Sequence, residues 1–426
     1  MSLDFSTPKS LGDSIRQLPP ADLEARISEL GVEPILEQTI AALTRAFLPH
    51  RAPSQPVVIA WKVDTAEGLQ ARYLTVGAGE CRFEPGEPPA PAVALVTTLP
   101  VFLRLVSGAL SGMQACARGQ LSIKGDMGLA LRQMTFFDID LENAELDLST
   151  PEELSVLIEG RSDNEIMQAA EITGLERVFD KVFQGMVDHF LPDKAVGHRG
   201  VIEWTLRTSE GIYIYHMTIA GGCSVQKGPA NAPRARLSTS LPIFLRLVAG
   251  KLNGMQAFAD SQLEVSGDFV LAQLQQTFFN ADLSGAELNI SRPSELARLI
   301  RDRNDAEIEA GIKVTGVDRA LDLVFQGMVD HYLPAKAGYK RAVVQWDFTT
   351  PEGPRCYQFI SDRGRCYYQR GVSEKPNVTL SASLPNFLRI AAGQLNGIVA
   401  LAKGKMKVRG NLLLARAHQG WFDLTR

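Results

Sequence analysis

Residues that could do chemistry recur at matched intervals in this sequence, but no complete catalytic set accompanies them. Cys81, Cys223 and Cys366 occupy one repeating position, where a reactive thiol trio or a shared metal site would be the available chemistry. No second ligand type keeps the same spacing, so we favour a small buried core residue at each position. His189 and His331 have no counterpart in the first repeat, which favours helix-capping or surface roles.

Motifs of catalysis and cofactor binding are absent from the sequence. It contains no G-x-S-x-G, no H-E-x-x-H, no P-loop, no C-x-x-C and no G-x-G-x-x-G after a strand. We therefore predict no catalytic residue, no metal ligand and no cofactor. An enzyme acting on an apolar intermediate would need a polar group facing a cavity, and the candidates are Gln273, Arg416 and His418.

Length, composition and charge limit the class of protein. A chain of 426 residues that is 45% apolar predicts about three globular domains. The net charge of −4 gives no indication of nucleic-acid binding, so we expect no nucleic-acid partner. Five cysteines, an odd number, suit a reducing compartment. Neither a signal-peptide pattern nor an apolar run of membrane-spanning length occurs, and we expect a cytoplasmic protein.

An internal repeat organises the chain into three copies. TLPVFLRLVSGALSGMQA (98–115) returns as SLPIFLRLVAGKLNGMQA (240–257) and again as SLPNFLRIAAGQLNGIVA (383–400), with a period of 142 to 143 residues. A tryptophan recurs with the same period. Because this period is far longer than that of a solenoid repeat, each copy can bury its own core.

Each copy has the pattern of a small α+β domain. In the second copy, apolar residues at helical spacing predict a helix over 175–192 that ends at a proline. Alternating or β-branched runs then predict strands at 201–208, 211–222, 223–226, 235–240 and 262–267. Ser240 and Asp268 suit the N-caps of two further helices. We predict three modules, each a mostly antiparallel five-stranded sheet with helices packed on one face.

The copies are joined by segments that are themselves helix-prone. The expected organisation is an N-terminal helical arm (1–30), modules at 31–140, 174–282 and 316–426, and helical connectors at 141–173 and 283–315. The first connector is acidic, and Thr150 before a Pro-Glu-Glu sequence suits a helix N-cap. We expect the connectors to pack on the modules.

One stretch resembles a known family. The run PVFLRLVSGALSGMQACARGQLSIKGDMGLALRQMTFF (100–137) is similar to the second half of a sterol carrier protein domain, of the family also called nonspecific lipid-transfer proteins. The matching pieces are the L-x-L-x-x-G-x-L helix, the G-x-L-x-I-x-G-D strand and the MGLAL helix start, and the ordered set appears three times. The Trp61 strand and the YLTVGAGEC segment match the first half more weakly. The resemblance implies an apolar tunnel between sheet and helices that holds sterols, fatty acyl chains or other lipids without catalysis or metal.

The tunnel implied by the resemblance would be lined by apolar residues from the helices of each copy. The candidates are Phe102, Leu105, Val106, Met113, Met127, Leu131, Met134 and Phe136 in copy one, Phe244, Leu247, Met255, Phe258, Phe269 and Phe278 in copy two, and Phe387, Ile390, Ile398, Leu401 and Trp421 in copy three. Apolar positions at helical spacing are equally typical of an ordinary core.

The last helix differs between the copies. Gln273 and Arg416 stand where copy one has Leu131, and glutamine replaces Met134 in both later copies. If this face lines the tunnel, copy one has the most apolar tunnel, and we predict that it carries most of the lipid affinity. The alternative is that the face is exposed to solvent in copies two and three.

The charge is divided unevenly along the chain. Residues 335–426 carry 15 Lys and Arg against 5 Asp and Glu, a net charge of +10, so the first 334 residues carry −14. Lys403, Lys405, Lys407 and Arg409 form a basic cluster that suits an anionic membrane surface or an acidic partner. The basic module could equally lie against the acidic connectors of its own chain.

These observations favour a soluble multi-module protein that binds or transfers sterol, fatty acyl or similar apolar ligands. One alternative is an enzyme or chaperone that isomerises or cyclises an apolar biosynthetic intermediate, and another is a scaffold that binds no ligand. The expected partners are a lipid and an anionic membrane touched by module three. The chain ends Leu424-Thr425-Arg426 and not in the Ser-Lys-Leu-type peroxisomal address frequent in the family, so the cytoplasm is the expected location.

Overall fold

The structure of the chain is a computed structural model. It describes residues 3–141, 143–146, 148, 150–279, 283, 285–286 and 288–423. The chain divides into two compact units, Met1–His189 and Phe190–Arg426. The expected end of module two at residue 282 and the terminal residues 424–426 lie outside the described residues.

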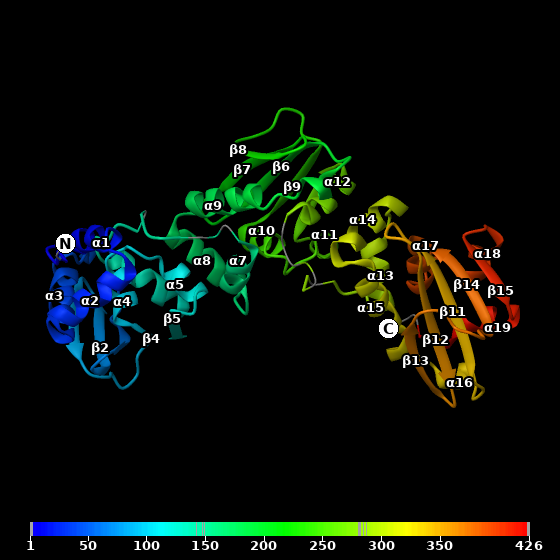
Figure 1. The fold of residues 1–426 in the computed structure, drawn as a ribbon, viewed down its shortest axis with the longest axis horizontal. Coiled ribbons are helices and arrows are strands. Elements are labelled where there is room, and N and C mark those ends of the chain that lie inside the picture. Colours follow the sequence, from blue (N-terminus) through cyan, green and yellow to red (C-terminus); the bar gives the residue numbers. More distant parts are fainter. Residues whose placement is uncertain are drawn as a thin grey trace. The chain divides into compact units, whose positions relative to one another are not determined.

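Unit one contains one five-stranded sheet and its helices (Figure 1). Its strands are β1 (Val57–Thr65), β2 (Gly68–Gly77), β3 (Glu80–Pro85), β4 (Val93–Thr98) and β5 (Leu121–Gly125). Its helices are α1 (Pro8–Arg16), α2 (Pro20–Leu30), α3 (Val32–Arg45), α4 (Leu99–Val106), α5 (Gly112–Ala117), α6 (Met127–Arg132), α7 (Pro151–Ile158), α8 (Asp163–Thr173) and α9 (Leu175–Asp188). The short 3₁₀ turns are η1 (Pro49–Arg51) and η2 (Gln133–Phe136).

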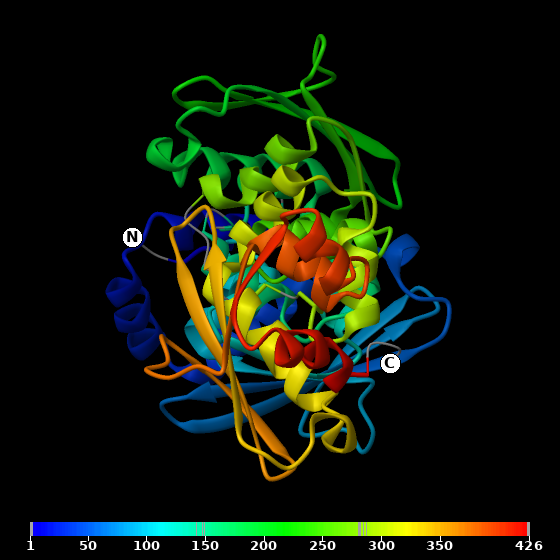
Figure 2. The ribbon, with the colours of Figure 1, turned by 90° about the vertical axis from the view of Figure 1, so that its right-hand side faces the viewer.

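Unit two contains two further sheets (Figures 1 and 2). The first has strands β6 (Gly200–Arg207), β7 (Ile212–Ile219), β8 (Cys223–Lys227), β9 (Ala235–Ser240) and β10 (Leu263–Gly267), and the second has β11 (Ala342–Thr349), β12 (Arg355–Asp362), β13 (Arg365–Arg370), β14 (Val378–Ser383) and β15 (Met406–Gly410). The helices are α10 (Leu241–Val248), α11 (Gly254–Ala259), α12 (Phe269–Leu274), α13 (Pro293–Ile300), α14 (Asp305–Thr315), α15 (Val317–Asp330), α16 (Pro334–Ala337), α17 (Leu384–Ala391), α18 (Gly397–Ala402) and α19 (Leu412–His418). The 3₁₀ turns are η3 (Pro192–Ala195), η4 (Gln275–Phe278) and η5 (Gln419–Trp421).

All three sheets have one topology. The first has the order β3-β2-β1-β4-β5, and the others repeat it. The first and fourth strands pair in parallel and the other three pairs are antiparallel. This confirms the predicted α+β class with a mostly antiparallel five-stranded sheet. Below, a module is one sheet with the three helices that follow its fourth and fifth strands. Module one has β1–β5 with α4–α6, module two has β6–β10 with α10–α12, and module three has β11–β15 with α17–α19.

A tryptophan on the first strand fixes the helix that follows the fourth strand. The Trp61 and Phe102 rings meet edge to face with their centres 5.1 Å apart, and Trp204 and Phe244 repeat this geometry at 5.1 Å. In module three the corresponding rings are 4.9 Å apart. Such aromatic pairs add to the stabilisation from apolar burial, so the repeated tryptophan and the repeated Leu-Pro helix form one packing unit.

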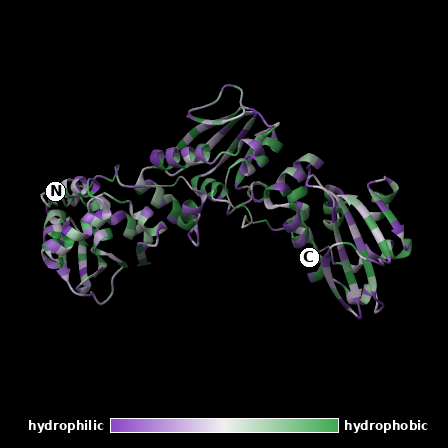
Figure 3. Ribbon diagram, viewed as in Figure 1, coloured by the Kyte–Doolittle hydropathy of each residue, from purple (hydrophilic) through white to green (hydrophobic). Residues whose placement is uncertain are grey.

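Alternation of hydropathy along the strands decides which face of each sheet is covered (Figure 3). In the edge strand β15, Met406 is buried while Lys407 and Arg409 are exposed. Successive side chains of a strand point to opposite faces, so one face of the sheet meets the helices and the other meets solvent.

The connectors form the capped helices that their sequences predict. Thr150 accepts a hydrogen bond from the Glu153 amide at the start of α7. Ser162 with Glu165, and Asn304 with Glu307, form complete capping boxes at the starts of α8 and α14. The helices α7 and α8 pack against α5 and α6, and α13 and α14 pack against α11 and α12, as expected. Within the described residues, no helix has the length and apolarity needed to cross a bilayer.

Candidate ligand-binding site

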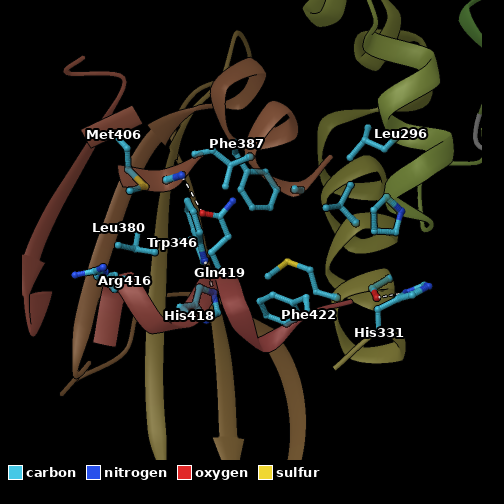
Figure 4. Close-up of a pocket in the computed structure, with 18 of the residues that line it drawn as sticks. Leu296, His331, Trp346, Leu380, Phe387, Met406, Arg416, His418, Gln419 and Phe422 are labelled. Atoms are coloured by element: carbon cyan, nitrogen blue, oxygen red, sulfur yellow. Dashed lines mark hydrogen bonds between the residues drawn. The ribbon is translucent and has the colours of Figure 1, made fainter. Parts of the chain in front are cut away.

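Module three contains an apolar cavity of about 220 Å³ (Figure 4). Its walls come from four parts of unit two: the connector around α13, the helix α15, the sheet, and the helices α17 to α19. The lining residues are Ile290, Ser291, Pro293, Leu296, Val324, Gly327, Met328, His331, Trp346, Leu380, Phe387, Ile390, Ala391, Gly397, Ile398, Leu401, Met406, Val408, Leu412, Ala415, Arg416, His418, Gln419 and Phe422. The volume exceeds the roughly 150 Å³ of an engineered apolar cavity that binds benzene.

One wall of the cavity depends on a glycine. A Cβ added to Gly327 would lie 1.8 Å from the carbonyl oxygen of Ser291. The connector backbone therefore crosses α15 in direct contact with this helix, which any side chain at residue 327 would prevent. This contact sets the wall formed by Ile290 and Ser291 against the wall formed by Val324 and Met328.

The mouth of the cavity is apolar and open to solvent. Ile398 and Leu401 on α18 are 53% and 36% exposed, and Leu412 on α19 is 58% exposed. Leu413, which follows Leu412 in the chain, is 80% exposed. Monomeric soluble proteins rarely expose such contiguous apolar side chains without a function.

Most polar groups of the cavity are used within the protein. The Gln419 side-chain oxygen accepts a hydrogen bond of 2.9 Å from the Gly397 amide. Nδ1 of His331 lies 2.8 Å from the Gly327 carbonyl oxygen at the end of α15, which fits the capping role predicted for this residue. Arg416 is exposed. His418 is 2% exposed, and burial lowers the pKa of its imidazole to about 3.

The sequence predicted part of the lining of this cavity. Of the candidates named in copy three, Phe387, Ile390, Ile398 and Leu401 line it. Trp421 is buried but does not line the cavity, and the next residue, Phe422, lines it instead. Both residues lie at the end of the 3₁₀ turn η5, which follows the last helix.

Sequence reasoning missed the walls that come from other segments. Leu296 lies on a connector, Val324 and Met328 on α15, and Leu380 in the sheet. All four belong to apolar patterns that predict helices or strands, and no sequence signal distinguishes them from core residues.

Module one contains a cavity of only about 40 Å³. Four predicted residues, Leu105, Met113, Leu131 and Met134, line it, whereas Phe102, Val106, Met127 and Phe136 do not. Helix α8 forms one side of this cavity through Ala169, Ile172 and Thr173. The space suffices for a few water molecules.

In module two the matching face is covered by the helix α14. Met255 is 1% exposed, and a Cβ added to Gly311 of α14 would lie 2.2 Å from its terminal methyl group. The Asn253 amide donates a 2.8 Å hydrogen bond to the Thr315 hydroxyl at the end of α14. Of the other predicted residues in this module, Phe244, Leu247, Phe269 and Phe278 are buried and Phe258 is partly buried.

An arginine seals the edge of this contact. The guanidinium carbon of Arg303, which precedes α14, lies 4.2 Å from the ring centre of Phe258 and 3.9 Å from that of Phe269. Cation–π contacts of this kind stabilise partly desolvated arginines. The Phe258 and Phe269 rings are therefore covered by the Arg303 side chain.

Module three has the larger of the two cavities described above, although its last helix has polar residues where that of module one has Leu131 and Met134. Glutamine at the Met134 position does not narrow module three, because Gln419 turns its oxygen to the Gly397 amide. Gln276 does the same for the Gly254 amide of module two, at 2.8 Å. Gln273 is buried with both side-chain polar atoms unpartnered in the described structure. The idea that the face is solvent-exposed in both later copies is thus wrong for Gln273, although Arg416 is exposed.

The recurring cysteines pack at the edge of the cores and form no site in the described residues. Cys81 and Cys366 are partly buried against the core clusters of their modules. Burial raises the pKa of the Cys223 and Cys366 thiols to about 11, and that of Cys81 is also raised. Thiols with raised pKa values are poor nucleophiles. No group of three metal-ligating side chains occurs in the part of the chain that the structure describes.

The basic cluster follows α18, the helix with exposed Ile398 and Leu401, in the sequence. Lys403, Lys405, Lys407 and Arg409 follow α18 and run along the edge strand β15, and all four are exposed. Among the described residues, we find no ion pair that neutralises them.

The sequence profile of the SCP-2 sterol transfer family matches three segments, residues 50–138, 179–280 and 330–423, which together span more than half of the chain. The chain belongs to the SCP-2 sterol transfer family. The resemblance stated from the sequence is thereby confirmed, and an apolar lipid is the class of ligand that membership supports. No curated protein is similar enough to the chain to match it.

Solved structures of two sterol carrier proteins and of a sulfatase also match parts of the chain. Sterol carrier protein 2 of Yarrowia lipolytica, in its apo form, is 18% identical, with 24% of this chain and 91% of that chain covered and a TM-score of 0.22. Sterol carrier protein 2 like 2 of Aedes aegypti is 19% identical, with coverages of 24% and 94% and a TM-score of 0.22. The stereoselective inverting sec-alkylsulfatase Pisa1 of Pseudomonas sp. is 20% identical over 41% of this chain and 30% of its own, with a TM-score of 0.23.

Proposed function

We propose that this protein is a lipid carrier in which module three is the open binding module. The observation that carries the proposal is the apolar cavity of about 220 Å³ in module three, with exposed leucine and isoleucine side chains at its mouth. Modules one and two have their matching faces against the connector helices α8 and α14. On this proposal, modules one and two have a structural role, and module three binds and releases the ligand.

The chemistry of the walls suits sterol, fatty acyl or similar ligands. Each buried methylene contributes about 0.8 kcal/mol to binding, so an acyl chain or sterol needs little more than apolar walls. Apolar contacts discriminate poorly between ligands that differ by one methylene, by about 1–3 kcal/mol. A tunnel of this kind would therefore accept several lipids.

We also propose that module three docks on anionic membranes. The exposed apolar mouth can enter the bilayer interface, and the four basic residues of the cluster can meet anionic headgroups at about 1 kcal/mol each. Lipid would then pass between bilayer and cavity without crossing water. The five cysteines are unpaired, which suits the reducing cytoplasm as the location.

Titration of the full chain with a fluorescent fatty acid tests the binding proposal. Ala415→Trp adds bulk inside the cavity, and we expect it to weaken binding at least tenfold. Ala417→Trp is the matched control, because Ala417 lies on the same helix, is exposed and lies outside the lining. A second filling variant, Ala391→Phe, acts from α17. Equal binding by all four proteins would place the ligand elsewhere.

Native mass spectrometry of the freshly purified chain tests the alternatives. A co-purified lipid supports the carrier. An empty protein that also fails to bind the fluorescent fatty acid supports a scaffold, and a chemically altered ligand supports an enzyme.

Co-sedimentation of the full chain with phosphatidylserine vesicles tests docking. Charge reversal of Lys403, Lys405, Lys407 and Arg409 to Glu should abolish the phosphatidylserine-dependent binding. The matched control reverses four other exposed basic residues from the same end of the chain, Lys336, Lys340, Arg365 and Lys375. Equal loss in both variants would show a non-specific effect of net charge and contradict docking through the mouth.

A further inference from the structure

One residue that lines the cavity of module three has a buried polar atom that the protein does not use. His418 lines the cavity at the end of α19 (Figure 4), and its Nδ1 has no hydrogen-bond partner in the described structure. The side chain is 2% exposed. Buried polar groups are nearly always hydrogen-bonded, so an exception inside a cavity calls for a ligand or a water.

The neighbouring tryptophan determines which nitrogen carries the proton. The indole Nε1–H of Trp346 lies 3.4 Å from Nε2 of His418. An indole nitrogen can only donate a hydrogen bond, so Nε2 must be the acceptor. In a neutral imidazole the proton is then on Nδ1, which makes the unpartnered atom a donor. The apolar surroundings keep the ring neutral at pH 7, since burial lowers its pKa to about 3.

Aromatic rings hold the imidazole in this position. The ring centres of Trp421, Phe422 and Phe359 lie 5.0, 5.1 and 5.5 Å from that of His418, all in edge-to-face geometry. None of these rings offers an oxygen that could accept the Nδ1 proton. The donor therefore stays unpaired until a molecule in the cavity supplies an acceptor.

In module one, the residue at the position of His418 is Gln133, and it has no unpartnered donor. Gln133 accepts the Trp61 indole hydrogen bond at 3.0 Å, and its own amide donates to the Ala130 carbonyl at 2.9 Å. Both ends of that glutamine are satisfied within the protein. In module three His418 keeps the bond to tryptophan but presents a second, unused N–H.

We propose that Nδ1–H of His418 donates a hydrogen bond to an oxygen of the bound lipid, so that module three selects apolar ligands with a carbonyl, ester or hydroxyl oxygen over hydrocarbons of the same shape. Trp346 is the positioning residue, because its indole sets the imidazole tautomer. The inference rests on the proposed function, since it needs a ligand in this cavity.

The test compares two probes of equal length, a long-chain methyl ketone and the corresponding alkane. Each displaces a fluorescent apolar dye from the full chain, and the signal lost in Ala415→Trp defines the dye bound in module three. We expect His418→Phe to weaken the ketone about five- to tenfold and to leave the alkane unchanged. Trp346→Phe, which frees the tautomer, should reduce the preference for the ketone to a smaller extent.

The tautomer itself can be observed without any ligand. Nitrogen-15 NMR of histidine-labelled protein should show a protonated Nδ1 and an unprotonated Nε2 for His418, assigned through the backbone signals of the unsubstituted chain. A protonated Nε2 would overturn the inference, and this readout does not require the substituted chain to fold. Equal displacement by ketone and alkane, unchanged in His418→Phe, would overturn it and leave the carrier proposal intact. Displacement by neither probe would overturn both.

Discussion

Modules two and three differ most in the surroundings of one apolar face, formed by α11 and α12 in the first and by α18 and α19 in the second. Met255 and Phe269 of module two are 1% and 7% exposed, whereas Ile398 and Leu412 at the matching positions of module three are 53% and 58% exposed. The residue types are similar. The covering helix α14 makes the difference, and no helix covers α18 and α19 within the described residues.

This difference shows that one apolar pattern serves two purposes. Against α14 the face is an ordinary packing surface, held by tight contact at Gly311 and by the hydrogen bond from Asn253 to Thr315. Without a covering helix the same face becomes the rim of a cavity. In this pair of modules, contact with the connector helix α14, and not the type of residue on the face, separates the buried face from the exposed one.

The largest expected effect is on stability at the matched methionine and isoleucine. Met255→Ala should destabilise module two by about 2–5 kcal/mol, because it leaves a cavity beneath α14. Ile398→Ala should change the stability of module three by no more than about 0.5 kcal/mol, as is usual for exposed positions. Hydrogen exchange in segments 254–274 and 397–418 reports the two modules separately. A similar loss of stability in the two variants would contradict the conclusion that, within the described residues, α14 covers this face in module two and no helix covers it in module three.

Acid should destabilise module three more than module two. The folded-state pKa of His418, about 3, lies below the value of about 6.5 expected in the unfolded chain. Between these pH values only the unfolded chain binds the proton, so stability falls as pH falls, by up to about 1.4 kcal/mol per pH unit. Module two has glutamine, which does not titrate, at this position.

Exchange in segment 397–418 at pH 7 and pH 5 checks this prediction. His418→Gln should remove most of the pH dependence. His331→Gln is the control, because His331 and Arg416 are the other titratable groups that line the cavity. An unchanged pH dependence in His418→Gln would contradict the assignment.

The two helix-capping asparagines should differ by a smaller amount. Asn253 and Asn396 each accept hydrogen bonds from two amides at the start of α11 and α18. Alanine at either position loses the cap, which costs about 1 kcal/mol. Asn253→Ala also removes the bond to Thr315 and should cost about 1 kcal/mol more. Denaturant unfolding with the same segmental exchange measures both, and equal costs would show that the bond to α14 contributes nothing.

The smallest expected effect concerns the arginine that closes module two. Arg303→Met keeps the apolar stem but removes the guanidinium from the Phe258 and Phe269 rings, which should cost about 0.5–1 kcal/mol. Arg301→Met is a nearby control. The same exchange measurement should show faster opening of α12 only in Arg303→Met.

Much of the fold could be predicted from the sequence. The order of the strands along each module and the helix starts at Thr150 and Asp268 follow from local patterns. These features depend on residues close together in the chain or on the repeat. The repeated Trp and Leu-Pro landmarks predict three copies of one fold because they recur in the same order.

The site could be predicted only in part. Phe387, Ile390, Ile398 and Leu401 were identified because one helix pattern contains them, whereas Leu296 and Val324 come from segments about 50 to 100 residues earlier. The expectation that copy one has the most apolar tunnel and carries most of the lipid affinity relied on the side chains of its last helix. It did not include α8, which lies against that helix and fills the space.

The sequence by itself determined the three-fold repeat, the α+β modules and the family, because these depend on hydropathy period, capping residues and ordered motifs. Only the tertiary structure decided where the larger apolar cavity lies and which lining residue has a buried polar atom without a partner. An apolar face is buried or exposed according to the partner that packs on it, and a histidine nitrogen is used or unused according to the ring beside it. Both depend on contacts between residues far apart in the chain, which no local pattern encodes.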